Sequence, residues 1–150
     1  MKLSVVIQVP AWGFVKRDTA GAVDFVSPLP CPFNYGEVLG TVAADGDSLD
    51  AVVLGGRLSR GATVEAVVVG AVDFWDAGQA DPKLICGEKP LTTRQRALVM
   101  RWFSGYALAK RLLNWRRNKT GLTTARGWLD AAQAAELVRR IDAREPVDND

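Results

Sequence analysis

Short runs of apolar and β-branched residues, separated by glycine and proline, fill the first 90 residues of the chain. Such runs predict strands, because β-branched side chains fit a pleated sheet while glycine and proline interrupt it. The longest run, residues 63–74, is expected to be the central strand, with Gly70 marking a bulge or bend. Further strands are predicted at residues 4–9, 22–26, 35–41, 51–54 and 83–86.

From residue 92 the apolar positions follow a helical period instead. Thr92 or Thr93 can cap this first helix. Its buried face is expected to hold Leu98, Met100, Trp102, Phe103, Tyr106, Leu108, Leu112 and Leu113, through to Trp115. A second helix is predicted over residues 131–143, with Asp130 as its N-cap and a polar tail at 144–150. Strands first and helices last indicate one α+β domain over residues 1–150, compatible with a small closed barrel flanked by two helices.

The composition excludes several classes of chemistry. The 150 residues include no histidine, which excludes His-based triads and His-ligated zinc. The two cysteines, Cys31 and Cys86, match neither a disulfide framework nor a zinc pattern. No apolar run is long enough to cross a bilayer, so we expect no membrane association. Because the cysteines form no disulfide framework, we expect the protein to reside in the reducing cytoplasm.

The net charge of +2 hides an uneven distribution. Residues 1–88 carry eleven acidic and six basic side chains, whereas residues 89–129 carry ten basic side chains and no acidic one. A basic block of this kind can bind nucleic acid, face an acidic segment of the chain, or bind a polyanionic substrate.

Three carboxylates, Asp45, Asp47 and Asp50, fall within six residues at the start of a predicted strand. Like charges this close repel one another, and a hard divalent cation such as Mg²⁺ removes that repulsion because it prefers carboxylate oxygen. The same residues are also an ordinary turn sequence, since Gly46 supplies positive φ and aspartate caps its own backbone. They do not fit a helix-loop-helix Ca²⁺ site, whose sixth position needs glycine where this chain has Asp50.

A second acidic cluster follows the predicted central strand and contains Asp76, Asp81 and Lys83. Two acidic loops at strand ends, one of them with a lysine, can together hold several cations while the lysine pairs with a phosphate oxygen.

With these residues the chain resembles the soluble family I inorganic pyrophosphatases. Residues 45–51 are similar to the family signature, residues 32–36 to its Pro-x-Asn-Tyr-Gly segment, and residues 76–83 to its Asp-x4-Asp-x-Lys loop. The resemblance runs from about Leu3 to about Ile141 and implies a five-stranded OB-like closed β-barrel with two C-terminal helices. It also implies Mg²⁺-dependent hydrolysis of pyrophosphate to two phosphates, with Mn²⁺ as a substitute, and a homo-oligomer, in bacteria a hexamer.

The resemblance also implies a role for each site residue. Asp45, Asp50 and Asp81 would be the principal metal ligands, and Asp76 would serve an additional cation. Asp47 would orient or deprotonate the attacking water. The phosphates would be contacted by Lys16, Tyr35, Lys83 and Tyr106.

The chain departs from the family pattern at several positions, and two of the family's phosphate-binding cations are missing. Gln8 stands where the family has glutamate, Cys31 where it has tyrosine, and Ala107 where a lysine follows the substrate tyrosine, while residues 19–32 contain no arginine. Two interpretations follow: nearby cations such as Arg17 or Lys110 take over, or the phosphoanhydride activity is weak or altered.

A non-enzymatic polyanion- or nucleic-acid-binding OB-like module is the competing interpretation. Residues 110–119 interleave bases with Trp115, as single-strand-binding surfaces do. The alternative for this segment is a helix end with a solvated basic face and Trp115 packed inward, which we favour, so no nucleic-acid partner is expected.

Overall fold

Five strands of the computed structural model close into a ring. The structure describes residues 1–13, 15–17, 20–27, 29–43 and 46–142. The ring strands are β1 (Lys2–Val9), β4 (Asn34–Val38), β5 (Asp50–Val53), β8 (Lys83–Cys86) and β6 (Thr63–Asp76), and β6 pairs back with β1. The predicted five-stranded OB-like barrel is therefore confirmed.

The ring closes because β6 is long enough to serve two neighbours. Its first residues, from Thr63 to Val67, pair with β1, and the residues from Val68 to Val72 pair with β8. The register shifts between Val68 and Gly70, which confirms the predicted bend. Gly70 is required there, because a Cβ atom at this position would lie 2.1 Å from Cζ2 of Trp128.

Four strand pairs of the ring are antiparallel, and the β5–β8 pair is parallel. The parallel register sets Asp50 opposite Lys83 at the start of both strands. Outside the ring, β2 (Val15–Arg17) pairs with β3 (Val23–Val26), while β7 (Gln79–Ala80) and β9 (Thr124–Asp130) both pair with β6. The sequence did not predict β2, β7 or β9.

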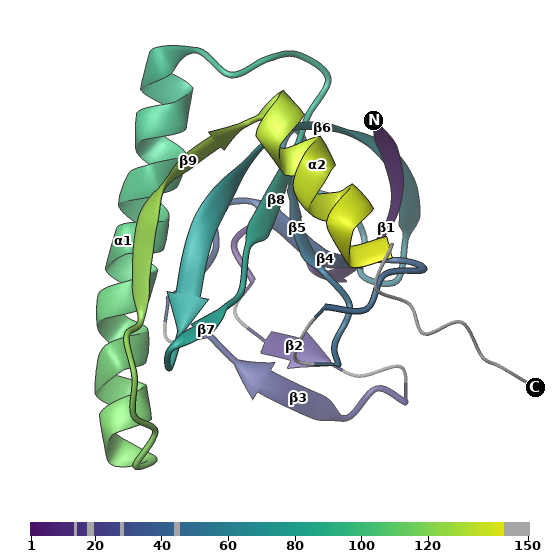
Figure 1. Ribbon diagram of the computed structural model, residues 1–150. Helices are drawn as coiled ribbons and strands as arrows, with labels where there is room; N and C mark the ends of the chain where they lie inside the picture. Colours follow the sequence, from purple (N-terminus) through teal and green to yellow (C-terminus); the bar gives the residue numbers. More distant parts are fainter. Residues whose placement is uncertain (14, 18–19, 28, 44–45, 143–150) are drawn as a thin grey trace, which may run out of the picture.

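Two helices pack on the barrel (Figure 1). The long helix α1 (Thr93–Arg116) runs along one side of it next to β9, and begins at a capping box between Thr92 and Gln95. Helix α2 (Ala131–Asp142) directly follows β9, and Asp130 accepts a hydrogen bond from the Gln133 amide as predicted. The expected helix end at residue 143 and the tail at 144–150 lie outside the described residues.

The core has two parts. Inside the barrel, side chains of β1, β5, β6 and β8 pack with Ala134 and Val138 of α2. Between the barrel and α1, the fully buried rings of Phe74 and Phe103 meet edge to face with centroids 6.1 Å apart. This second cluster fixes α1 against the rim of the barrel. Among the residues described, no helix combines the length and apolarity needed to span a membrane.

The apolar face predicted for α1 is wrong in part. Leu98, Leu108 and Leu112 are exposed, and Trp115, expected to pack inward, is 74% exposed. Phe103 is fully buried as predicted, and the helix also buries Val99, Ala107 and Asn114. A helix that is apolar on more than one side does not reveal from its sequence which side meets the core.

Candidate active site

A pocket of about 400 Å³ opens between the rim of the barrel and α1. It brings together seven of the nine predicted site residues. They are Lys16, Tyr35, Asp47, Asp50, Asp81, Lys83 and Tyr106. Asp45 lies outside the described residues, and Asp76 is described but does not line the pocket.

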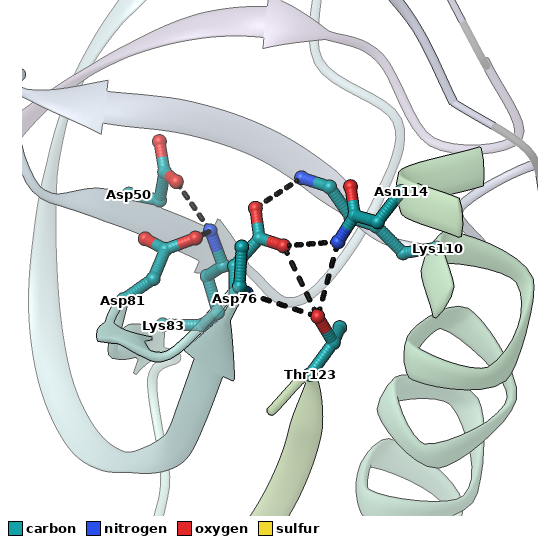
Figure 2. Close-up of polar contacts among 8 residues, drawn as sticks. Asp50, Asp76, Asp81, Lys83, Lys110, Asn114 and Thr123 are labelled. Atoms are coloured by element: carbon teal, nitrogen blue, oxygen red, sulfur yellow. Dashed lines mark hydrogen bonds and ion pairs between the residues drawn. The ribbon is translucent and has the colours of Figure 1, made fainter. Parts of the chain in front are cut away.

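Lys83 lies between two carboxylates on the barrel wall of this pocket (Figure 2). Its Nζ atom is 2.5 Å from Oδ2 of Asp50 and 2.7 Å from Oδ2 of Asp81. The side chain of Lys83 is only 4% exposed, whereas those of Asp50 and Asp81 are 18% and 24% exposed. The parallel β5–β8 register positions Asp50, and the hydrogen bond from the Asp81 amide to the Phe74 carbonyl anchors the turn before β8.

This cluster carries one negative charge more than its lysine neutralises. Burial raises the pKa of Asp50, but the Lys83 ammonium outweighs it and holds that pKa below its usual range. Burial raises the pKa of Asp81. The Lys83 charge lowers it and the Asp50 charge raises it, and the net result is a raised pKa. Burial lowers the pKa of Lys83, but Asp50 and its other anionic neighbours hold it well above its usual value. The lysine is therefore charged at neutral pH.

Tyr35 and Tyr106 bring phenol groups to the pocket from opposite sides. Tyr35 lies on β4, and its ring centroid is 5.8 Å from Nζ of Lys83. Tyr106 lies on α1, where its ring stacks on that of Trp102 with centroids 5.1 Å apart. Burial raises the pKa of both tyrosines, so both hydroxyls keep their protons and can donate hydrogen bonds to an anion.

Asp47 and Lys16 complete the more open part of the pocket. Asp47 is exposed, and its backbone carbonyl accepts a hydrogen bond from the Ala43 amide at 2.7 Å. Lys16 comes from β2. Cys31 also lines the pocket, but burial raises the pKa of its thiol to about 11, so it is a small apolar side chain there and not a nucleophile.

The lining also includes two lysines outside the predicted site set, Lys110 and Lys119. Arg17, considered above as a replacement cation, does not line the pocket and donates to the Gly21 carbonyl instead.

Asp76 belongs to a separate polar network behind Lys110 (Figure 2). Its Oδ2 atom is 2.9 Å from Nζ of Lys110, and its Oδ1 atom accepts a hydrogen bond from Nδ2 of Asn114 at 2.9 Å. Thr123 contacts both Asp76 and Asn114. Nothing local in the sequence marks Asn114 or Thr123. The one signal for Asn114 was its spacing, since residues 106, 110 and 114 fall on one face of a helix.

The described carboxylates do not form a metal cage by themselves. Within the described ranges, no three His, Cys, Asp or Glu side chains lie close enough together to hold a metal ion. Asp50 and Asp81 nevertheless each bind Lys83 through Oδ2, and Figure 2 shows their second oxygens directed away from the ammonium. This all-oxygen donor set, with its excess negative charge, fits a hard divalent cation.

Comparison with known proteins agrees with this geometry. The family model described as inorganic pyrophosphatase matches residues 5–144. The chain belongs to the inorganic pyrophosphatase family. Among curated members of this pyrophosphatase family, one from Neisseria meningitidis serogroup B is 29% identical over 158 residues, an alignment covering 91% of this chain and 85% of that protein. One from Aeropyrum pernix is 28% identical, in an alignment that covers 95% of this chain and 89% of that protein.

Solved structures of inorganic pyrophosphatases also share the fold. The crystal structure of the pyrophosphatase from Thermus thermophilus superposes with a TM-score of 0.78 at 29% identity, covering 95% of this chain and 90% of that one. The barrel fold is thus common to this chain and this solved relative.

Proposed function

We propose that this chain hydrolyses inorganic pyrophosphate to two phosphates with the help of divalent cations. The observation that supports this most directly is the convergence of Asp47, Asp50, Asp81 and Lys83 on one pocket, in a chain that belongs to the inorganic pyrophosphatase family. Three further properties remain predictions: a single domain, a cytoplasmic location and a homo-oligomeric state. For the last, the family resemblance suggests a hexamer.

In this proposal Asp50 and Asp81 hold the cations together with Asp45, which lies outside the described residues. Mg²⁺, or Mn²⁺ in its place, would neutralise phosphate charge and lower the pKa of water. The metal role of Asp76 stays a prediction, and it would require Asp76 to give up its contacts to Lys110 and Asn114.

The protein side chains then have distinct tasks. Asp47 accepts a proton from the attacking water while the oxygen of that water bonds to one phosphorus. The bond from that phosphorus to the bridging oxygen breaks, and the bridging oxygen leaves with the second phosphate. Lys83 and the protonated hydroxyls of Tyr35 and Tyr106 donate to phosphate oxygens, and Lys16 adds a charge at the open side.

Phosphate release from pyrophosphate tests the proposal. We expect release that requires Mg²⁺, stops with EDTA and falls at least about 100-fold in Asp47→Asn, because loss of a general base removes about 10²–10⁴ in rate. Asp142→Asn is the matched control, since it removes the same charge from an exposed position on α2, outside the pocket lining. Equal loss in both variants, or release that persists in EDTA, contradicts the mechanism.

The competing polyanion-binding function gains one observation from the structure. Trp115 is exposed within the basic block, as a base-stacking platform requires. If the wild type releases no phosphate yet binds single-stranded DNA with a steep salt dependence, the binding function replaces the enzymatic one. Slow release that still depends on Mg²⁺ and Asp47 would indicate the weakened enzyme.

A further inference from the structure

The helix wall of the pocket carries its own cation. Lys83 on the barrel wall lies between two carboxylates whose combined charge exceeds its own, so a second cation would strengthen the binding of an anionic ligand. The position after Tyr106 does not supply a cation, because it is Ala107, packed against the barrel at 2% exposure. Lys110 is one helical turn beyond Tyr106 on the same face of α1, and it lines the pocket.

The polar network behind Lys110 fixes where its ammonium lies. Asp76 holds Nζ of Lys110 at 2.9 Å, with both side chains less than 20% exposed. The other oxygen of Asp76 is held by Asn114, which is 5% exposed and also bonds Oγ1 of Thr123 at 3.0 Å. The same ammonium lies 5.7 Å from the ring centroid of Tyr106.

Backbone contacts lock this network from the other side. The Ala77 amide donates to Oγ1 of Thr123 at 3.0 Å, and the Gly78 amide donates to the Leu122 carbonyl at 2.9 Å. Gly121 permits this close approach, since its φ is +106° and a Cβ atom there would lie 2.5 Å from the Ala77 carbonyl oxygen. The segment at residues 121–123 therefore holds Asp76 and the two residues after it, although more than forty residues separate these two segments in the sequence.

We propose that Lys110 is the cation that binds the substrate phosphate on the α1 side of the pocket, and that Asp76 is a positioning residue that holds it there. The inference deepens the proposed pyrophosphatase function and rests on it. Asp76 already has Lys110, Asn114 and Thr123 as partners for its two oxygens, an arrangement suited to orienting a lysine.

Five variants test this inference: Lys110→Gln, Lys110→Arg, Asp76→Asn, the double variant of Lys110→Gln with Asp76→Asn, and Arg101→Gln. The last removes one positive charge from an exposed position of the same helix and is the matched control. Each is measured for pyrophosphate turnover, for the Mg²⁺ concentration of half-maximal activity, and by calorimetry for binding of imidodiphosphate, a non-hydrolysed analogue. Thermal unfolding checks that each variant folds.

We expect Lys110→Gln to weaken imidodiphosphate binding and raise KM by about 10- to 100-fold, as for loss of one charge-assisted hydrogen bond. Lys110→Arg, which keeps the charge, should recover most of that loss. Asp76→Asn should weaken binding less, and the double variant should match Lys110→Gln alone, because Asp76 acts through Lys110. The Mg²⁺ midpoint of Asp76→Asn should equal that of the wild type.

Three outcomes overturn the inference. Unchanged binding in Lys110→Gln would make the ion pair merely structural. A higher Mg²⁺ midpoint in Asp76→Asn, or an additive double variant, would make Asp76 a metal ligand. Failure of the proposed function gives a different result: a wild type that binds imidodiphosphate through Lys110 but releases no phosphate refutes the hydrolysis and keeps the assignment of Lys110.

Discussion

Replacing Lys83 by methionine separates the structural role of the buried cluster from its role in metal binding. Methionine has a similar length but no charge, so the variant leaves Asp50 and Asp81 side by side without their shared ammonium. The lysine is 4% exposed and lies 2.5 Å and 2.7 Å from the two carboxylates, so its pairs are buried ones. Removing one partner of a buried pair costs about 3–5 kcal/mol of unfolding free energy.

The stability deficit should depend on both pH and metal. Even with Lys83 present, the pKa of Asp81 is raised. In the variant, Asp81 therefore takes up a proton more readily in the folded state than in the unfolded state. The deficit is therefore full above this raised pKa and shrinks as the pH falls through it. Mg²⁺ should also reduce the deficit, because without Lys83 the two carboxylates should bind the cation more tightly than in the wild type, and each tenfold gain in affinity adds about 1.4 kcal/mol of stability at saturating Mg²⁺.

Urea denaturation followed by circular dichroism measures these changes, in EDTA and in saturating Mg²⁺. Arg139→Gln is the control, because its ion pair with Glu136 is exposed and should contribute about 0.2–1 kcal/mol. A deficit below about 1 kcal/mol for Lys83→Met in EDTA would refute the argument from burial. A deficit that is large but identical with and without Mg²⁺ would refute the assignment of Asp50 and Asp81 as metal ligands.

Two further predictions concern packing and thiol reactivity. Gly70→Ala should lower the unfolding free energy by about 1–3 kcal/mol in urea denaturation, because its Cβ would lie 2.1 Å from the Trp128 ring. Gly127→Ala is the control and should not lower it, because the space around Gly127 is open. Equal effects of the two substitutions would contradict the clash. Burial raises the pKa of Cys31 to about 11 and that of Cys86 to about 12. At about pH 8 we therefore expect iodoacetamide to react about 100-fold more slowly with Cys31, and about 1000-fold more slowly with Cys86, than it does in urea. Comparable rates in the folded and unfolded protein would contradict their burial.

Local patterns predicted most strands but could not show how the ring closes. The β-branched run at residues 63–74 identified β6, yet the ring closes only because β6 also pairs with β1, which is far from it in the sequence. Strand β9 escaped prediction because it is half-exposed along its length, contains Gly127, and lacks the alternation that marks a strand. Tertiary pairing with β6, not local propensity, makes this segment a strand.

The candidate site was predictable where residue type alone carries the chemistry. Carboxylates near Lys83 indicated a cation site from sequence, and the pocket brings Asp47, Asp50 and Asp81 together with it. The support behind Lys110 was not predictable, because an asparagine within a helix and a threonine before a strand have many roles. Only their packing against Asp76 shows what they do.

The position of the lysine on α1 can differ from the family pattern because of how each wall of the pocket is built. Asp50 and Lys83 are fixed by sheet register, and moving a strand by one residue would turn every side chain to the opposite face. Helix α1 is less restrictive, since residues 106, 110 and 114 all fall on its pocket side. A lysine can therefore move one turn along α1 and still reach the same pocket, provided something holds it there. In this chain the ion pair with Asp76 holds Lys110 on that wall, although the position after Tyr106 is alanine.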